Sequence, residues 1–149
     1  MKDGFLKVAA ATPRIRVADC SYNASRVEAM AAEAAENGAA LLVFPELCIS
    51  GYTCGDLFFE SALLDACEAA LERLCRELPG ERMVIVGVPL RQTDRLYNCA
   101  AVLFQGKIIG IQVKSYIPNY NESYEKRWFS DSFDLPQETI VLQGETIPF

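Results

Sequence analysis

The 149-residue sequence contains no histidine, and this absence removes whole classes of enzyme chemistry. Nucleophile arrangements of the Ser-His-Asp and Cys-His kinds need an imidazole to move the proton. Any proton transfer in this chain must therefore use a carboxylate, a lysine or a thiol. Zinc sites built from Cys and His clusters are disfavoured for the same reason, and we expect no metal at the site.

The sequence also lacks the patterns that mark disulfide-bonded, membrane and nucleic-acid-binding proteins. Its six cysteines include no CxxC pair, so we expect mostly free thiols. Lys7 and Arg14 interrupt the first apolar residues, which leaves no run long enough for a signal sequence or a membrane span. The net charge of −6, without any basic cluster, argues against nucleic acid or an anionic membrane as a partner. These absences predict a soluble, cytoplasmic protein.

What the sequence contains is sufficient for one domain with a real core, because 51% of its residues are hydrophobic. Two segments predict amphipathic helices. Residues 21–38 repeat apolar side chains at helical spacing and end in Asn37-Gly38, and residues 61–80 carry a stripe of Leu and Cys that ends at Pro79-Gly80.

Short apolar runs between and after these helices predict strands at residues 5–11, 41–44, 83–90, 96–104 and 107–114. Gln105-Gly106 joins the last two of these in the manner of a tight hairpin. Residues 138–149 read as one more strand and the entry to another. The order β-α-β-α-β followed by a hairpin indicates an α/β sandwich rather than a purely parallel sheet.

A single carboxylate, Glu46, follows the apolar run 41–44 directly after Pro45. Open α/β sheets gather their sites at such strand ends. Held against Phe44, Tyr52 and Phe58, this carboxylate would be partly desolvated, which suits a general base. The alternative is a glutamate that only caps or pairs with charges of a surface loop.

Lys114 ends the strand predicted at 107–114 and opens an aromatic, charged loop over residues 114–129. A fixed ammonium at a strand end can stabilise an oxyanion or hold a neighbouring carboxylate ionised. It can equally be a lysine that ends a strand in solvent. By default, Glu122 and Glu125 of this loop are solvated charges.

The cysteines offer no clear nucleophile. Cys67 and Cys75 lie on the apolar stripe of a helix and Cys99 lies within a strand, so we expect all three in the core. Cys48 and Cys54 flank the Glu46 loop. A reactive thiol needs an electropositive or deprotonating neighbour, and the sequence shows none for either.

Three segments carry a family resemblance: FPELCISGYTCGDLFF, YNCAAVLFQGKIIGIQVK and KSYIPNYNESYEKRWF. Together they resemble the nitrilase, or carbon-nitrogen hydrolase, superfamily, and within it the N-terminal glutaminase domains of glutamine-dependent NAD+ synthetases. The resemblance implies an α-β-β-α sandwich with a Glu-Lys-Cys triad. It places the general base on Glu46 and the lysine on Lys114, puts Tyr52 and Tyr120 beside the glutamine, and puts a second glutamate of the site on Glu122.

The chain departs from the family pattern in one important respect. The family nucleophile follows the lysine only after further strands, and none of the six cysteines matches its position. We therefore expect residues 1–149 to be a partial nitrilase-like glutamine amidohydrolase domain, incomplete at the C-terminus, without the synthetase domain and inactive on its own.

For a full-length parent, the resemblance implies hydrolysis of glutamine and transfer of the ammonia to ATP-dependent NAD+ synthesis. It implies no cofactor for the glutaminase domain, with ATP and Mg bound by the synthetase domain. Glutamine, the synthetase domain and further copies of the chain in a homo-oligomer are the expected partners. Two alternatives stay open: a stand-alone amidase or carbamoylase, and a non-catalytic binding or assembly module in which Glu46 and Lys114 form a structural ion pair.

Overall fold

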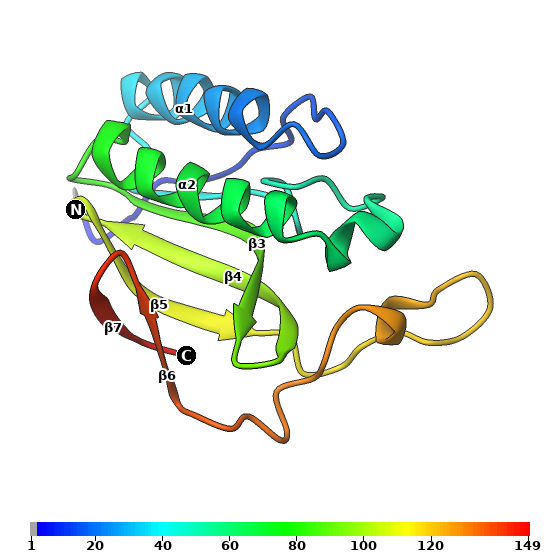
Figure 1. The fold of residues 1–149 in the computed structure, drawn as a ribbon. Helices are drawn as coiled ribbons and strands as arrows, with labels where there is room; N and C mark the ends of the chain where they lie inside the picture. Colours follow the sequence, from blue (N-terminus) through cyan, green and yellow to red (C-terminus); the bar gives the residue numbers. More distant parts are fainter. Residues whose placement is uncertain (1–2) are drawn as a thin grey trace.

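The computed structural model describes residues 3–149 and is built on a five-stranded sheet of order β1-β2-β3-β4-β5 (Figure 1). The first three strands run parallel, and each of the last two runs antiparallel to its predecessor. This mixed sheet confirms the predicted order of elements. The bounds are β1 Val8–Ala10, α1 Cys20–Glu36, β2 Leu41–Val43, α2 Ser61–Glu77, β3 Met83–Gln92, β4 Arg95–Phe104, β5 Lys107–Val113, β6 Thr139–Leu142 and β7 Glu145–Pro148, with 3-10 turns η1 Gly55–Phe59 and η2 Glu125–Arg127.

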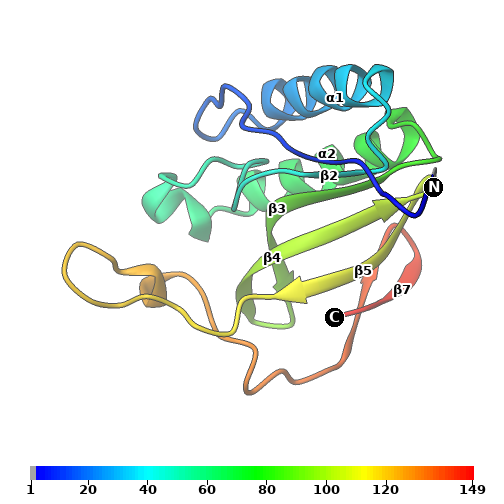
Figure 2. The same cartoon turned by 180° about the vertical axis from the view of Figure 1, so that it is seen from behind.

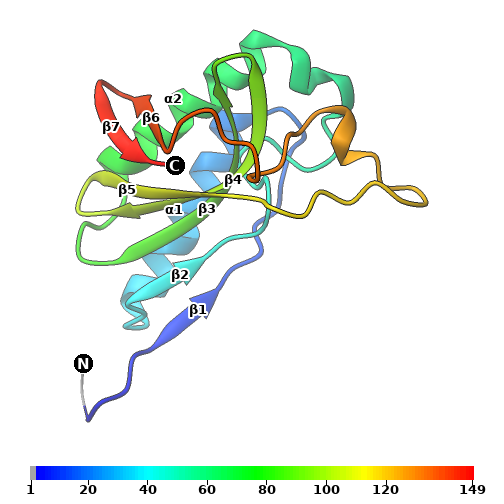
Figure 3. The same ribbon diagram turned by 90° about the horizontal axis from the view of Figure 1, so that it is seen from below.

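Both long helices cover the same face of the sheet, as Figures 1 and 3 show. The apolar stripe of α2 is buried as its spacing predicted, and it faces alternate residues of β3. Asp19 caps the N-terminus of α1: its carboxylate accepts a hydrogen bond from the backbone N–H of Tyr22 and so satisfies one of the free donors of the first turn. Among residues 3–149, no helix is both long and apolar enough to cross a membrane.

The β4–β5 hairpin turns at Gln105 and Gly106, both with positive φ (51° and 76°), as a two-residue turn of this kind requires. Gln143 and Gly144 repeat this geometry in the β6–β7 hairpin, which lies against β5. β1 is shorter than predicted. The strand begins only at Val8, and Phe5 and Leu6 before it are 82% and 56% exposed.

The two faces of the sheet have different surroundings, because α1 and α2 both cover the same face (Figures 2 and 3). Val84, Val86 and Val88 of β3 point toward the helices and are fully buried. Ile85, which alternates with them, lines a cavity of about 300 Å³ on the second face, together with Val43, Phe44, Glu46, Gly87, Asn98, Cys99, Ala100, Gln112 and Lys114.

Strand direction determines which loops meet. Because β4 is antiparallel to both of its neighbours, β5 runs in the same direction as β2 and β3. The C-terminal ends of β2 and β5 therefore lie at the same edge of the sheet. The segments that follow them, around Glu46 and Lys114, are brought together although they are far apart along the chain.

Gly87 allows the chain after β2 to cross closely over β3. A Cβ atom at this position would lie 2.3 Å from the backbone nitrogen of Leu47 and 2.5 Å from the carbonyl oxygen of Pro45. Both are backbone atoms, which cannot move aside as a flexible side chain can. The absence of a side chain at residue 87 thus sets the path of the segment that carries Glu46.

We expect Gly87→Ala to lower the free energy of unfolding by about 1–3 kcal/mol, because the added methyl forces the 45–47 backbone away from β3. Urea denaturation of both proteins measures this loss. Gly110→Ala in β5 is the matched control, since no atom lies within 4 Å of its added Cβ. Equal stabilities of the two variants would contradict the close approach as the reason for glycine at residue 87.

Candidate functional site

Glu46 lies three residues beyond β2, in a turn that backbone hydrogen bonds hold against β3. The N–H of Phe44 donates to the carbonyl of Ile85 at 2.9 Å, and the N–H of Ile49 donates to that of Gly87 at 3.2 Å. Between them, Leu47 adopts a φ of 50°, a left-handed conformation that is strained for a residue other than glycine. The turn aims the Glu46 carboxylate at the end of β5.

Lys114 directly follows β5 and meets that carboxylate. Its backbone N–H donates to the carbonyl of Asn98 at 2.9 Å, which continues the β4–β5 ladder, and its Nζ lies 2.6 Å from Glu46 Oε1. The side-chain amide of Asn98 donates to the same oxygen. The two side chains proposed from the sequence therefore converge, with Asn98 as a third member of the cluster.

A second carboxylate, Glu125, binds Lys114 from the other side. Lys114 Nζ lies 2.9 Å from Glu125 Oε2, and the Tyr52 hydroxyl donates to Glu125 Oε1 at 2.6 Å. Glu125 is only 4% exposed. The default expectation of a solvated loop charge is therefore wrong for this residue, because η2 turns its side chain inward.

The structure does not bring Glu122 into this cluster. Glu122 is exposed on the loop, three residues before Glu125, and makes no hydrogen bond or ion pair within residues 3–149. Tyr52, by contrast, contacts the cluster through Glu125. Of the side chains that the family resemblance placed here, Glu46, Lys114 and Tyr52 are joined and Glu122 is not.

Burial and pairing act in opposite directions on the Lys114 ammonium. Partial burial works to lower the pKa of Lys114, but the hydrogen bonds and charges of Glu46 and Glu125 outweigh it and raise that pKa above the ordinary value. Lys114 is therefore held as a cation. The hydrogen bond to Glu125, aided by burial and by the nearby carboxylate charges, raises the pKa of Tyr52 to about 12, so its phenol is held as a donor.

The aromatic enclosure expected around Glu46 forms only in part, because Phe44 lines the same cavity whereas Phe58 packs elsewhere. The Glu46 side chain is 42% exposed, and Phe58 is buried against Trp128 and Phe129 instead. The hydrogen-bond partners of the Glu46 carboxylate are Lys114 and Asn98. Its exposed side lies at the cavity on the second face of the sheet, where an incoming group can reach it.

Lys114 lines two cavities at once. One is the cavity of about 300 Å³ that also contains Glu46. The other, of about 470 Å³, lies along the following loop and is lined by Tyr120, Lys126 and Asp131 among others. Tyr120 is 69% exposed and touches the site through this second hollow rather than through the Glu46 cluster.

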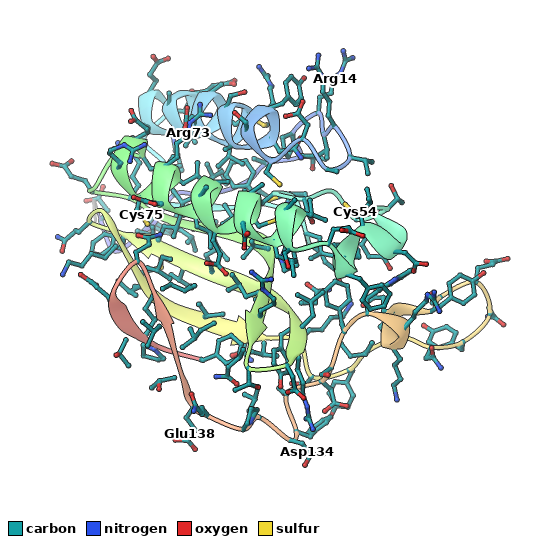
Figure 4. All side chains as sticks on the ribbon, in the orientation of Figure 1. Arg14, Cys54, Arg73, Cys75, Asp134 and Glu138 are labelled. Atoms are coloured by element: carbon teal, nitrogen blue, oxygen red, sulfur yellow. The ribbon has the colours of Figure 1, made fainter. Side chains whose placement is uncertain are left out.

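No thiol of the chain hydrogen-bonds to Glu46 or Lys114. All six cysteines are buried and free, and Figure 4 shows Cys54 and Cys75 at opposite ends of the layer formed by η1 and α2. Cys48, two residues from Glu46, donates to the carbonyl of Gly87, and burial raises its pKa to about 11. Cys99 lines the Glu46 cavity, but its thiol donates to the carbonyl of Tyr97, and burial raises its pKa. These are structural thiols.

The site offers no evident metal ligand set. Within residues 3–149, no three or more Asp, Glu, Cys or His side chains are grouped so as to hold a metal ion. The two carboxylates of the cluster are bridged by an ammonium rather than by a shared cation. The chemistry that this cluster supports is proton transfer and oxyanion stabilisation.

Comparison with known proteins identifies close relatives for nearly the whole chain. The sequence profile of the carbon-nitrogen hydrolase family matches residues 7–146. A glutamine-dependent NAD(+) synthetase of Mycobacterium tuberculosis (strain ATCC 25618 / H37Rv) is 41% identical over 98% of this chain, and one of Mycobacterium leprae (strain TN) is 36% identical over 98%. The chain spans 22% of the length of each of these relatives.

Solved structures agree with these relatives. The glutamine-dependent NAD(+) synthetase of Cytophaga hutchinsonii matches 97% of this chain, and 25% of its own length, with a TM-score of 0.90 at 25% identity. An amidase from Nesterenkonia sp. matches 98% of this chain, and 55% of its own, with a TM-score of 0.73 at 21% identity. This second likeness confirms the nitrilase-superfamily fold.

The raised pKa of Tyr52 makes stability depend on alkaline pH in a defined direction. Below pH 10 the phenol is protonated in the folded and unfolded states, so the bond to Glu125 contributes fully. As the pH rises from 10 to about 12, the unfolded phenol ionises first and this stabilisation is lost.

We therefore expect the free energy of unfolding to fall more steeply over this pH window in the wild-type protein than in Tyr52→Phe. Urea denaturation at intervals of pH between 9 and 12 measures the difference, with Tyr22→Phe as a control for loss of a tyrosine hydroxyl elsewhere in the chain. Parallel pH profiles for Tyr52→Phe and the wild type would show that the Tyr52–Glu125 bond does not form.

Proposed function

Because the chain belongs to the carbon-nitrogen hydrolase family, we propose that it supplies the base and the electrostatic groups for hydrolysis of the glutamine side-chain amide. In a protein that also carries a synthetase domain, the released ammonia would feed ATP-dependent NAD+ synthesis; the support for this is that the relatives are named glutamine-dependent NAD(+) synthetases. The observation that carries this proposal is the Lys114 ammonium, which bridges Glu46 and Glu125 at the mouth of a cavity.

In this proposal Glu46 is the general base. Its carboxylate accepts the proton of a cysteine thiol, and the thiolate attacks the carbonyl carbon of the glutamine amide. The tetrahedral intermediate collapses with loss of ammonia, which takes up the proton from Glu46. Water, deprotonated by the same carboxylate, then cleaves the glutamyl thioester to glutamate and regenerates the thiol.

Lys114 is suited to hold the oxyanion of the tetrahedral intermediate. An ammonium has three N–H donors. Here Nζ bonds to Glu46 Oε1 at 2.6 Å and to both oxygens of Glu125, at 2.9 and 3.3 Å, and we propose that the two bonds to Glu125 share one N–H. The remaining donor is available for a negatively charged oxygen in the cavity. Its raised pKa favours the ammonium form at the start of the cycle, when both carboxylates are ionised.

We assign the second carboxylate of the site to Glu125 rather than to Glu122. Glu125 is buried, fixes Lys114 and accepts the Tyr52 hydroxyl, whereas Glu122 is exposed. Tyr120, which lines the hollow beside Lys114, is the proposed contact for the glutamine backbone. The hydrolysis itself needs no cofactor, and ATP and Mg belong to the synthetase partner domain.

The nucleophile is the one group of this mechanism that these residues do not supply. Each of the six thiols is buried, and none hydrogen-bonds to Glu46 or Lys114 among the described residues. We propose that a cysteine outside these residues enters the cavity on the second face of the sheet. On this view the 149-residue chain alone is inactive, and it assembles as a homo-oligomer in the cytoplasm.

A second candidate is a non-catalytic binding or assembly module. The same observation supports it, because the Glu46–Lys114 pair at 2.6 Å links two loops and has a structural effect whether or not it acts on a substrate. A stand-alone amidase shares the hydrolytic chemistry and differs in its substrate. The two predictions below separate these candidates.

In a longer protein that contains the nucleophile, we expect Glu46→Gln to lower glutamine-dependent turnover by about 10²–10⁴-fold, because the amide cannot accept the thiol proton. Turnover with added ammonia bypasses this step and should be retained. Ammonia release and NAD+ formation measure the two activities, with the exposed Glu81→Gln as control. Unchanged glutamine-dependent turnover would favour the non-catalytic module.

For residues 1–149 alone, we expect no steady-state release of ammonia from glutamine, because no described thiol contacts the proposed base. A coupled glutamate dehydrogenase assay at high protein concentration measures this. Turnover that scales with protein concentration and disappears in Glu46→Gln would contradict the assignment of the nucleophile to a residue outside this chain.

A further inference from the structure

Asp56 lies in η1 and makes three hydrogen bonds to side chains of the loop that carries Glu125. Its carboxylate accepts Arg127 Nε at 2.8 Å and Arg127 Nη2 at 2.9 Å, one on each oxygen, and Trp128 Nε1 at 3.0 Å. Such a two-pronged Arg–carboxylate pair fixes orientation as well as distance. Nothing in the proposed mechanism uses this contact, yet it joins the segment of Tyr52 to the segment of Glu125.

An apolar contact lies next to this polar one. Phe58, also in η1, is 1% exposed, and its ring lies 5.9 Å from that of Trp128 and 4.9 Å from that of Phe129. Both distances are in the range of favourable tilted ring pairs. η1 therefore contacts residues 127–129 through the buried ring of Phe58 and the exposed carboxylate of Asp56. We call these contacts together the η1–η2 latch.

The η2 turn transmits the position of the latch to Glu125. The backbone N–H groups of Trp128 and Phe129 both donate to the carbonyl of Glu125, at 3.0 and 2.9 Å. Arg127 donates in the same way to the carbonyl of Tyr124 at 2.9 Å. Because these bonds close a single tight turn, a shift of the backbone at Arg127 or Trp128 also moves the backbone of Glu125.

We propose that Asp56 is a positioning residue of the site: by fixing Arg127 and Trp128 on η1, it holds Glu125 in contact with Lys114 and Tyr52. The catalytic meaning of this role rests on the proposed function, whereas the positioning itself is a property of this chain. Asp56 touches neither Lys114 nor Glu46 and acts only through η2.

The need for such a latch follows from the rest of the loop. Ile117 is buried, but none of residues 118–124 is buried, and Tyr120 and Tyr124 are 69% and 58% exposed, so few apolar contacts hold this part of the loop. Glu125 nevertheless buries a charge, which is favourable only while its partners stay in place. An exposed ion pair adds little to global stability, so the effect of Asp56 should be local.

The experiment compares Asp56→Ala with Asp65→Ala in the 149-residue protein. Asp65 is the matched control, because it pairs with Arg91 at 2.6 Å and is exposed to a similar extent (66% against 62%), in α2. The readout is the ionisation of Tyr52, followed by NMR of carbon-13-labelled tyrosine up to pH 11, where a phenol with a pKa of about 12 is still mostly protonated and one with a pKa near 10 is mostly ionised. The Tyr52 signal is identified by its loss in Tyr52→Phe.

We expect the pKa of Tyr52 to fall in Asp56→Ala from about 12 toward the ordinary value near 10, since the phenol loses its carboxylate acceptor. Asp65→Ala should leave it unchanged. Trp128 is the single tryptophan of the chain, so its fluorescence reports on the same event, and acrylamide should quench it more strongly in Asp56→Ala.

An unchanged pKa of Tyr52 in Asp56→Ala would overturn the proposal, and so would an equal fall in Asp65→Ala, which would show a general loosening. If circular dichroism shows that Asp56→Ala does not fold, Asp56→Asn and Arg127→Gln each remove one charge of the pair and keep a polar side chain in its place. The pKa of Tyr52 in these variants is then compared with that in Asp65→Ala in the same way. None of these readouts requires glutamine hydrolysis. A negative result here therefore leaves the role of Glu46 standing, and failure of the Glu46→Gln test leaves the latch standing.

Discussion

The site depends on one interaction, the bridging of two carboxylates by the Lys114 ammonium. Glu46 reaches it from the turn after β2 and Glu125 from the loop after β5, so a single cation connects segments that share no regular structure. Glu125 is almost completely buried, and a buried carboxylate is stable only when it is paired and hydrogen-bonded. Lys114 and the Tyr52 hydroxyl meet this requirement together. The shape of the aromatic loop is therefore tied to the charge of one side chain.

The sheet provides the frame for this interaction. The antiparallel β4 turns β5 back into the direction of β2, which brings two strand ends to one edge. Asn98 lies opposite Lys114 on β4, and its side-chain amide donates a hydrogen bond to Glu46. Gly87 then lets the Glu46 turn lie directly on β3. The result is a charged cluster on a rigid support, with its exposed side toward a cavity.

Much of this arrangement could be predicted from the sequence because it is encoded locally. The apolar stripe of residues 61–77 and the Gln105-Gly106 turn each specify their own element, and the family motifs around Glu46 and Lys114 led to the family that the comparisons confirm. Convergence of those two residues followed from placing both at strand ends.

The rest could not be predicted because it depends on contacts between distant segments. Glu122 and Glu125 lie in the same polar loop, and only the η2 turn, fixed from outside by Asp56 and Phe58, decides that Glu125 faces inward. Asn98 gave one usable signal, as the one amide side chain within an otherwise largely apolar strand. The sequence did not indicate that this amide binds Glu46, because that contact depends on the folded arrangement of β4 and the turn after β2.

The left-handed Leu47 has a consequence for the range of sequences that this turn tolerates. Its side chain is 1% exposed while its φ is 50°, so the position combines a core requirement with a backbone conformation that favours glycine or asparagine. Glycine would relax the backbone but leave a hole, asparagine would bury an amide, and a β-branched residue would clash with its own main chain. An apolar side chain that is unbranched at Cβ, such as leucine, fills the core and leaves the strain in the backbone, so few other residues suit this turn.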